Sequence, residues 1–327
     1  FTGNVGIGTT TPRDTLQVFS GNITVGIDTA NATVISPSYI TLTTQGNIPS
    51  VPVAGDLQIF SKNVGTRAML SQQGPSGIDT SIQPFLGRNR AYYWAPVGLN
   101  TATAPATTFS ATAFTAAGTA TARAFATTNI LTRATRVAYV SAATAAAMAS
   151  LRVATAWLTT GTGTGLGGFF YVCRFSVTDA ATVAGARMFV GLSSNTAAAT
   201  NVDPATQLNQ LGVAQISTDA TQWYFVYGGS AAQTAIALGT ALGAPTAAGT
   251  LWDLALFANP SANGVIGYTM TNVGTGVSVT GSITPGTPGT QTPANTTALT
   301  PQIWRTNNAT LLAVAFDFVS LYIETDD

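Results

Sequence analysis

Carboxyl groups are the side chains best able to do acid–base chemistry in this chain. Hydrolysis of a glycosidic bond needs two of them facing each other. Asp253 and Asp317 fall within apolar stretches, where burial would raise the pKa of a carboxyl group, so these two form the best candidate pair. The other acids considered are Asp179, Asp203, Asp219 and, in the acidic tail, Glu324. A structural carboxylate bonded to loop backbone is the commoner role, and we favour it over catalysis.

Histidine is absent, and Cys173 is the single cysteine. Serine–histidine and cysteine–histidine catalysis therefore lack their base within one chain. One cysteine forms neither an intrachain disulfide nor a thiolate metal site, and Cys173 lies among aromatic residues as a small core residue does. No D-x-[DN]-x-[DN]-G calcium loop is present. We predict no catalytic residue, no metal site and no cofactor.

Three motifs that could bind a ligand also have a simpler structural interpretation. Arg133 and Arg136 could clamp an anionic sugar, but we favour an ordinary surface or interface pair. Gly163–Gly168 matches G-x-G-x-x-G, yet a dinucleotide site needs a helix after it, whereas Phe169–Val177 has strand character; we expect a loop. Tyr92–Trp94 could stack on a sugar or base, but such clusters more often plug a small domain or an interface.

The composition is unusually poor in charge. The 327 residues include 12 basic and 12 acidic side chains, and charged residues make up 7%, against about 25% in an average soluble protein. A net charge of zero gives no field that would attract nucleic acid or an acidic membrane, and no apolar run reaches the roughly 18 residues of a spanning helix. The polar surface must therefore be Thr, Ser, Asn and Gln, which suits a rigid extracellular protein. The start at Phe1 suggests the ordered part of a longer polypeptide.

The amino-terminal residues contain a short repeat. Gly3–Gly8 (GNVGIG) recurs as Gly21–Gly26 (GNITVG). Gly-Asn favours turns, and the Val/Ile alternation after it indicates short strands. Strands this short bury no face alone, so we expect residues 1–30 to form a shaft that stacks on other copies of the chain; the alternative is two ordinary hairpins. Residues 31–100 alternate like strands between turns and predict a small β-rich connector domain.

Residues 101–327 predict a large C-terminal antiparallel β-sandwich of jelly-roll type. The alternation in Phe169–Val177 places five apolar residues on one face, with Arg174 and Ser176 on the other. The run Leu311–Ile323 is apolar at both parities and predicts a central strand. The alanines of Ala145–Ala149 favour a helical turn. The fold class expected is therefore all-β.

Three stretches resemble the tail-fibre and receptor-binding proteins of tailed bacteriophages. Gly3–Pro12 (GNVGIGTTTP), followed by Leu16–Val18, is similar to a repeat of fibre shafts. Gly74–Asp79, with Gln83-Pro84 after it, resembles a small connecting domain of such fibres. Thr300–Asn307 and Val319–Asp326 are similar to their C-terminal sandwich domains.

The resemblance implies a homotrimeric virion fibre, located on the particle surface, that binds a host-cell polysaccharide or protein. Its partners would be two further copies of itself, a bacterial surface receptor, and other phage tail or baseplate proteins through an N-terminal part not in this sequence. Binding of nucleic acid and insertion into membranes are not expected. No ligand-binding residue carries over. A capsid or tail decoration protein, and a capsule depolymerase that uses Asp253 or Asp317, are the alternatives.

Overall fold

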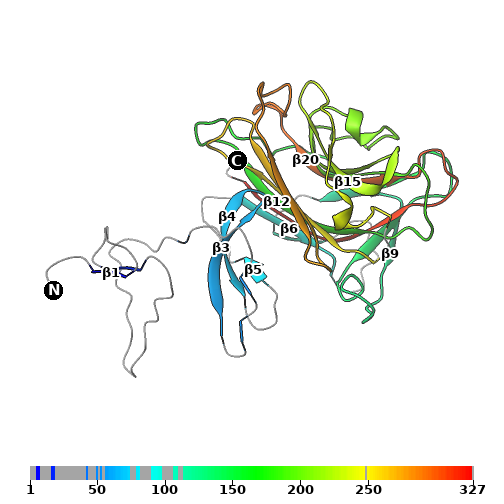
Figure 1. Ribbon diagram of the computed structural model, residues 1–327. Coiled ribbons are helices and arrows are strands. Elements are labelled where there is room, and N and C mark those ends of the chain that lie inside the picture. The colour runs from blue at the N-terminus through cyan, green and yellow to red at the C-terminus, as the bar shows by residue number, and fades with distance from the viewer. Residues whose placement is uncertain are drawn as a thin grey trace. The chain divides into compact units, whose positions relative to one another are not determined.

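The computed structural model describes residues 5–7, 16–18, 42, 49, 50, 52, 53, 56–73, 79–81, 90–97, 106–109, 113–246 and 249–325 (Figure 1). The chain divides into two compact units, Phe1–Thr43 and Thr44–Asp327. The domain boundaries predicted at residues 30 and 100 stay predictions. Among the described residues, no helix combines the length and the apolar character that crossing a bilayer requires.

In the first unit, the described residues include one short pair of strands. β1 (Val5–Ile7) and β2 (Leu16–Val18) run parallel, with Val5 opposite Leu16. A hairpin would pair antiparallel, so these two strands do not form one. The second copy of the repeat, Gly21–Gly26, lies outside the described residues, and its stacking on sister chains stays a prediction.

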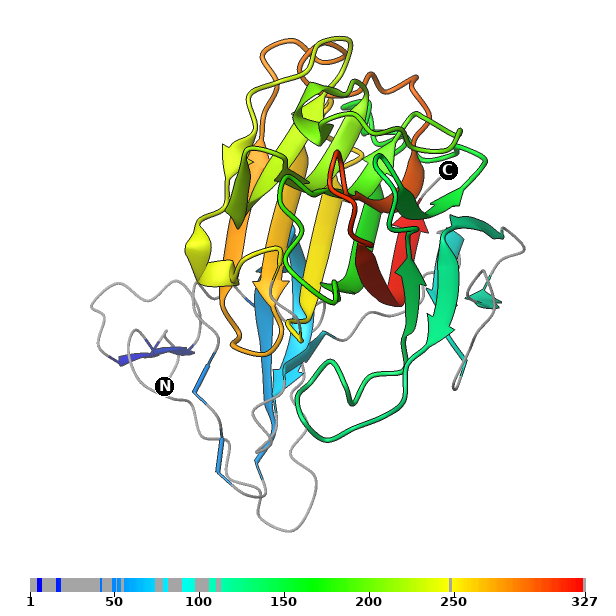
Figure 2. The ribbon, with the colours of Figure 1, turned by 90° about the vertical axis from the view of Figure 1, so that its right-hand side faces the viewer.

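The second unit is dominated by two large antiparallel sheets, which form a β-sandwich (Figure 2). One is nine-stranded, in the order β19 (Ser278–Ile283), β18 (Ile266–Asn272), β17 (Trp252–Ala258), β12 (Phe169–Val177), β21 (Ala315–Thr325), β10 (Val137–Val140) and β9 (Thr119–Ala122), with β6 (Arg90–Ala95) joined to β21 and β7 (Ala106–Phe109) joined to β6. The other is seven-stranded, in the order β16 (Ile236–Ala237), β15 (Asp219–Gly228), β14 (Gln210–Ile216), β13 (Arg187–Ser193), β20 (Thr300–Thr306), β11 (Met148–Val153) and β8 (Phe114–Ala117). Two short 3-10 helices, η1 (Pro204–Thr206) and η2 (Thr240–Leu242), lie in the connections. The predicted all-β class and antiparallel sandwich are confirmed.

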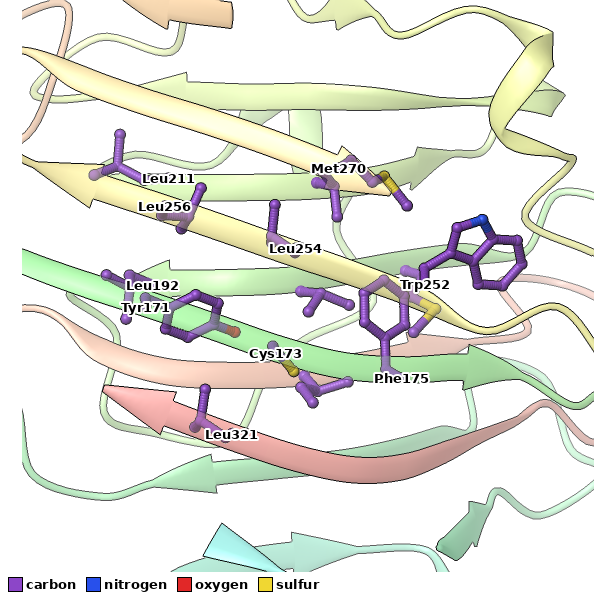
Figure 3. Packing of buried hydrophobic residues seen from close by; sticks show 14 of the residues in the cluster. Tyr171, Cys173, Phe175, Leu192, Leu211, Trp252, Leu254, Leu256, Met270 and Leu321 are labelled. Atoms are coloured by element: carbon purple, nitrogen blue, oxygen red, sulfur yellow. The ribbon is translucent and has the colours of Figure 1, made fainter. Parts of the chain in front are cut away.

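The core between the two sheets is built from alternate residues of their strands. On β12 the five residues Phe169, Tyr171, Cys173, Phe175 and Val177 are all buried, as the alternation predicted. Figure 3 shows several of them packed against leucines and Trp252 of neighbouring strands. The chain passes from one sheet to the other at Gly118, which has a φ of 88° and where a Cβ would lie 2.7 Å from the carbonyl oxygen of Val140. Only glycine combines that φ with so close an approach.

The predicted helical turn at Ala145–Ala149 is wrong. The amide of Ala147 donates to the carbonyl of Thr144 in a tight turn, and β11 begins at Met148. β11 pairs with β20 on one side and β8 on the other, so two ladders of backbone hydrogen bonds outweigh the helix propensity of the alanines. The central strand predicted from residue 311 is present but begins later, at Ala315. Leu311 lies in the preceding loop and is 69% exposed.

A small third sheet covers part of the outer face of the nine-stranded sheet. It contains β3 (Gln58–Val64), β4 (Arg67–Gln73) and β5 (Asp79–Ser81). Met69 packs against Phe170 and Ala255, and the amide of Gly65 donates to Thr269 Oγ1 at 2.8 Å. This outer face, opposite the core, carries the charged side chains considered next.

Candidate functional site

Asp253 and Asp317 do not face each other as a pair. They lie on β17 and β21, which flank β12, where Asp253 is opposite Arg174 and Asp317 is opposite Ser176. Arg174 binds the Asp253 carboxylate with two hydrogen bonds, at 2.7 and 2.6 Å. Each acid is thus held by a guanidinium group, which is a structural role, although the partners are arginine side chains and not the loop backbone favoured from the sequence.

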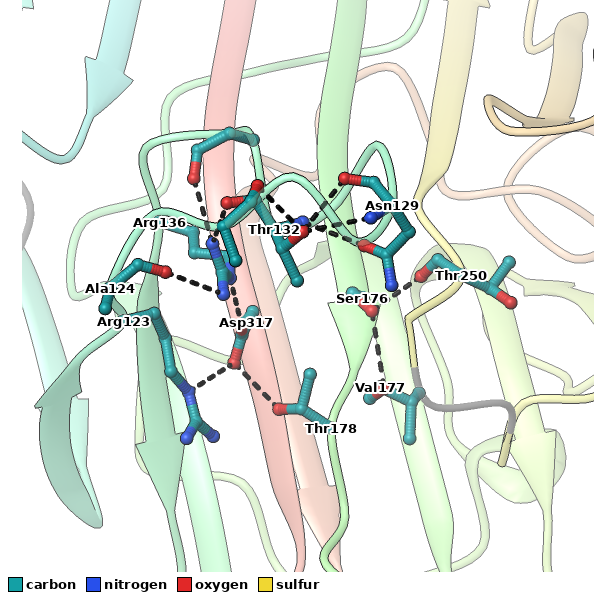
Figure 4. A network of polar contacts seen from close by, with 12 residues as sticks. Arg123, Ala124, Asn129, Thr132, Arg136, Ser176, Val177, Thr178, Thr250 and Asp317 are labelled. Carbon is teal, nitrogen blue, oxygen red and sulfur yellow. Dashed lines mark hydrogen bonds and ion pairs between the residues drawn. The ribbon is translucent and has the colours of Figure 1, made fainter.

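The carboxylate of Asp317 fixes a loop on the outer face of the sheet. Arg136 Nε donates to it at 2.9 Å, Arg123 Nε at 3.4 Å and Thr178 Oγ1 at 2.7 Å (Figure 4). Arg136 also donates to the backbone carbonyl of Thr132. The anion clamp of Arg133 and Arg136, which the sequence disfavoured, is not formed, and neither is the surface pair favoured over it, since Arg136 is buried in this network whereas Arg133 is exposed.

The other candidate acids are also engaged in structural contacts. Asp179 forms a buried ion pair with Arg305. Asp203 caps η1 through the amide of Ala205 and accepts from Ser217.

Asp219 accepts hydrogen bonds from Thr221, Tyr224 and Gln222. These bonds, that from Thr221 foremost, hold the pKa of the Asp219 carboxyl well below its ordinary value. No group of three or more His, Cys, Asp or Glu side chains suited to holding a metal occurs in the part of the chain that the structure describes.

The remaining motifs have the structural roles favoured from the sequence. Cys173 is fully buried, and burial raises the pKa of its thiol. Gly163–Gly168 forms a loop before β12, and the amides of Gly163 and Gly165 donate to the carbonyl of Pro260. Trp94 of β6 is fully buried, and its ring packs edge-on against Phe114 at 5.1 Å, so this aromatic cluster plugs the sandwich.

A continuous row of polar side chains crosses the outer face of the nine-stranded sheet. Its members stand opposite one another on five neighbouring strands: Ser278 (β19), Thr271 (β18), Asp253 (β17), Arg174 (β12) and Ser320 (β21). We call these five residues the polar row. Neighbouring strands are about 4.8 Å apart, so the row is about 19 Å long.

The polar row stays accessible between two covered parts of the same face. The side chains of Arg174 and Asp253 are 41% and 24% exposed. On one side the small third sheet covers Val172 and Tyr322. On the other, Ser176 is buried, and its hydroxyl donates to the carbonyl of Thr250.

The polar row offers both hydrogen-bond donors and acceptors without net charge. Arg174 has donors only, the Asp253 carboxylate has acceptors only, and the serine and threonine hydroxyls act as both. Thr271 Oγ1 and Ser278 Oγ already lie 2.8 Å apart. Burying an unpartnered charge is costly, but the charges of Arg174 and Asp253 compensate each other. The arrangement suits a ligand that carries many hydroxyl groups and little charge.

A second feature of this face is a hollow of about 190 Å³ beneath the small sheet, lined by Arg67, Phe170, Phe257 and Glu324 among others. Arg67 binds the Glu324 carboxylate at 3.1 and 3.3 Å, and its guanidinium carbon lies 4.9 Å from the Phe170 ring centre. The pKa of Tyr322 is raised to about 12, mainly by burial and to a smaller extent by the nearby Glu324 carboxylate. The guanidinium of Arg67 therefore already occupies the Phe170 ring face and the Glu324 carboxylate, and these contacts tie the small sheet to the sandwich.

The sequence missed the polar row because its members are far apart in the chain. Arg174 and Asp253 are separated by 79 residues. The alternation of β12 did place Arg174 on the face opposite the core. Only the register of five strands brings the hydroxyls into line with it.

Comparisons with known proteins assign no family. No protein-family model matches the chain, and no curated protein matches it. Among solved structures, the winged bean acidic lectin complexed with methyl-α-D-galactose is similar at 9% identity, over 72% of this chain and 98% of that chain, with a TM-score of 0.46. A seed lectin of Lotus tetragonolobus is similar at 12% identity, over 72% and 97%, with a TM-score of 0.44. A protein of unknown function from Shewanella oneidensis is similar at 12% identity, over 72% and 86%, with a TM-score of 0.41. Likenesses this weak assign neither a family nor a ligand to the chain.

Proposed function

We propose that this chain is a homotrimeric virion fibre protein of a tailed bacteriophage, and that the polar row binds a glycan on the host-cell surface. The resemblance of Gly3–Pro12 and Thr300–Asn307 to phage fibre proteins supports the fibre assignment. The observation that carries the glycan assignment is the polar row, which is accessible, neutral overall and rich in donors and acceptors. No reaction is proposed.

Recognition would rest on hydrogen bonds. Sugar hydroxyls donate and accept, as the side chains of the polar row do. The two hydrogen bonds between Arg174 and Asp253 fix both side chains before a ligand arrives, which lowers the entropy lost on binding. Because this pair is neutral overall, we expect uncharged glycans to be preferred over anionic ones.

The test is binding of the purified protein to host cells and to polysaccharide isolated from them. Thr271→Val with Ser278→Ala removes two hydroxyls of the polar row. At about 0.5–1.5 kcal/mol for each hydrogen bond lost, affinity should fall about 5- to 150-fold. Thr162→Val with Thr164→Val is the matched control, since these two hydroxyls also lie 2.8 Å apart and are exposed, but on the loop before β12.

The outcomes separate the parts of the proposal. Loss of binding in the Thr271/Ser278 variant alone supports the polar row as the site. Equal binding by both variants places the glycan site elsewhere. Failure of the unaltered protein to bind any host cell or polysaccharide removes the receptor-binding function and favours a decoration protein. Release of reducing ends from the polysaccharide would instead indicate a depolymerase.

A further inference from the structure

The polar row is longer than any single sugar ring. It runs across the strands, from Ser278 on β19 to Ser320 on β21, over about 19 Å at a strand spacing of about 4.8 Å. A sugar ring is about as wide as one such spacing. One ring therefore contacts only neighbouring members of the row and cannot contact Ser278 and Ser320 together.

One long side of the polar row is bounded by the turn between β3 and β4. The amide of Gly65 in this turn donates to Thr269 Oγ1 at 2.8 Å. Thr269 is the outward-facing residue of β18 next to Thr271, two positions away. Thr66 lies so closely against Gly267, the outward-facing position after that, that a Cβ on this glycine would have no room. The turn therefore rests on the outer face directly beside the row.

The opposite long side is bounded by the loop that Asp317 fixes (Figure 4). Asn129 Nδ2 of this loop lies 2.8 Å from the position that a Cβ on Gly249 would take, and Ile130 Cγ2 lies 3.7 Å from the corresponding position on Gly274. Gly249 precedes β17 and Gly274 follows β18, so the loop reaches across the ends of both strands. The polar row is thus the floor of a strip that runs between this loop and the β3–β4 turn.

The two short ends of the strip are not closed by any described strand. β19, which carries Ser278, is the last strand of its sheet. β10 and β6 pair with β21 at Ala315–Phe318 and Leu321–Thr325, so neither of them stands opposite Ser320. No member of the polar row lines the hollow beneath the small sheet. A ligand in the strip is therefore contacted along its length, and no described strand encloses it at an end.

We propose that the strip binds an interior stretch of an extended, uncharged polysaccharide chain, with successive sugar units on successive strands. This inference rests on the glycan binding of the proposed function and names the part of the glycan that is bound. A site that recognises one terminal unit is concave and encloses most of that unit. The polar row instead offers a few hydrogen bonds on each of five strands, and each bond contributes little alone. Affinity must therefore depend on the length of the bound chain.

The test uses polysaccharide isolated from host cells and cut by mild acid into fragments of graded size. The fragments compete with the whole polysaccharide for the full protein chain, and they are compared at equal mass of sugar. Cutting multiplies the chain ends without changing the units, so it would make inhibition stronger at a site that recognises ends. At the strip, cutting should make inhibition weaker. Single units lose several hydrogen bonds and should inhibit at least about tenfold less well than fragments that span the row.

Variants at the two ends of the row provide a second readout. Ser278→Ala and Ser320→Ala should each weaken binding of long fragments by about 2- to 12-fold, and together by about the product of the two factors. The double variant should affect single units less, because no single unit contacts both ends. Thr162→Val with Thr164→Val, on the loop before β12, is the matched control and should leave binding of long fragments unchanged.

The outcomes distinguish this inference from the proposed function. Inhibition that strengthens with fragment length until the fragment spans the row, together with weaker binding in both end variants, supports the inference. If the protein binds the whole polysaccharide but single units or the shortest fragments inhibit as well at equal mass, the site recognises chain ends; the inference is then overturned and the proposed function stands. If the whole polysaccharide does not bind, both are overturned. Long fragments that bind the end variants and the unaltered protein equally place the site outside the polar row and also overturn the inference.

Discussion

Replacing Asp179 with alanine is expected to destabilise the sandwich more than the loss of any half-exposed ion pair. The side chain of Arg305 is fully buried and that of Asp179 is 3% exposed. Arg305 Nε donates to Asp179 Oδ1 at 3.0 Å, and the amide of Ala315 donates to the same oxygen at 2.7 Å. Arg305 lies on β20 of the seven-stranded sheet and Ala315 begins β21 of the nine-stranded sheet, so one carboxylate joins the two layers.

The size of the effect follows from the burial of Arg305. Removal of one partner of a buried ion pair leaves an uncompensated charge and costs about 3–5 kcal/mol. For a unit of this size, each kcal/mol lowers the melting temperature by about 2–4 °C, so Asp179→Ala should lower it by about 6–20 °C. The variant that also carries Arg305→Met should recover much of the loss, because apolar replacements of a buried pair are often neutral.

Thermal unfolding followed by circular dichroism at one protein concentration measures these shifts, since association makes the melting temperature depend on concentration. Asp253→Ala is the control, because its partner Arg174 is 41% exposed and exposed pairs contribute about 1 kcal/mol or less. A shift for Asp179→Ala no larger than that for Asp253→Ala would refute the reasoning.

Three further predictions concern a loop contact, a hydrogen-bonded acid and the buried thiol. Gly161→Ala should cost about 1–3 kcal/mol, because its Cβ would lie 2.0 Å from the backbone oxygen of Asn259; Gly286→Ala, which meets only a side chain at 3.4 Å, should stay within about 0.5 kcal/mol in the same melting experiment. The pKa of Asp219 is lowered by hydrogen bonds, so its contribution to stability should be present above the ordinary pKa of about 3.9 and be lost as the pH falls through the lower folded value; carboxyl NMR titration checks the pKa, and acid unfolding of Asp219→Asn checks the contribution. Cys173 is buried and the pKa of its thiol is raised, so it should react with a thiol reagent only after the protein unfolds. If the folded protein reacted as fast as an exposed thiol does, Cys173 would not lie in the core.

Strands of the sandwich were predictable where the pattern of their own residues indicates both the strand and its buried face. The alternation of Phe169–Val177 identified β12 and its buried face, and the apolar run before Ile323 identified β21 as a central strand. The prediction was wrong at Ala145–Ala149 because local propensity contains no information about the two strands that flank β11. The start of β21 was predicted too early for a related reason, because the apolar character of Leu311 does not by itself show that this residue lies in a loop.

The candidate site was less predictable than the fold. Asp253 and Asp317 stood out as acids in apolar strands, but their arginine partners come from distant segments. Arg67 and Glu324, 257 residues apart, gave no signal of their contact. A row of hydroxyls becomes visible only when the register of five strands is known, because Ser and Thr are common throughout this chain.

The position of β21 has a consequence for how the molecule is made. This strand lies between β12 on one side and β10 and β6 on the other, and each of those neighbours is synthesised before it. Until β21 is synthesised, the other strands of the nine-stranded sheet form three groups that no strand joins: β19-β18-β17-β12, β10-β9 and β6-β7. The sheet is therefore completed only when its last strand, β21, has been synthesised. A nascent chain stalled before residue 315 would expose unpaired strand edges to chaperones or to other nascent copies.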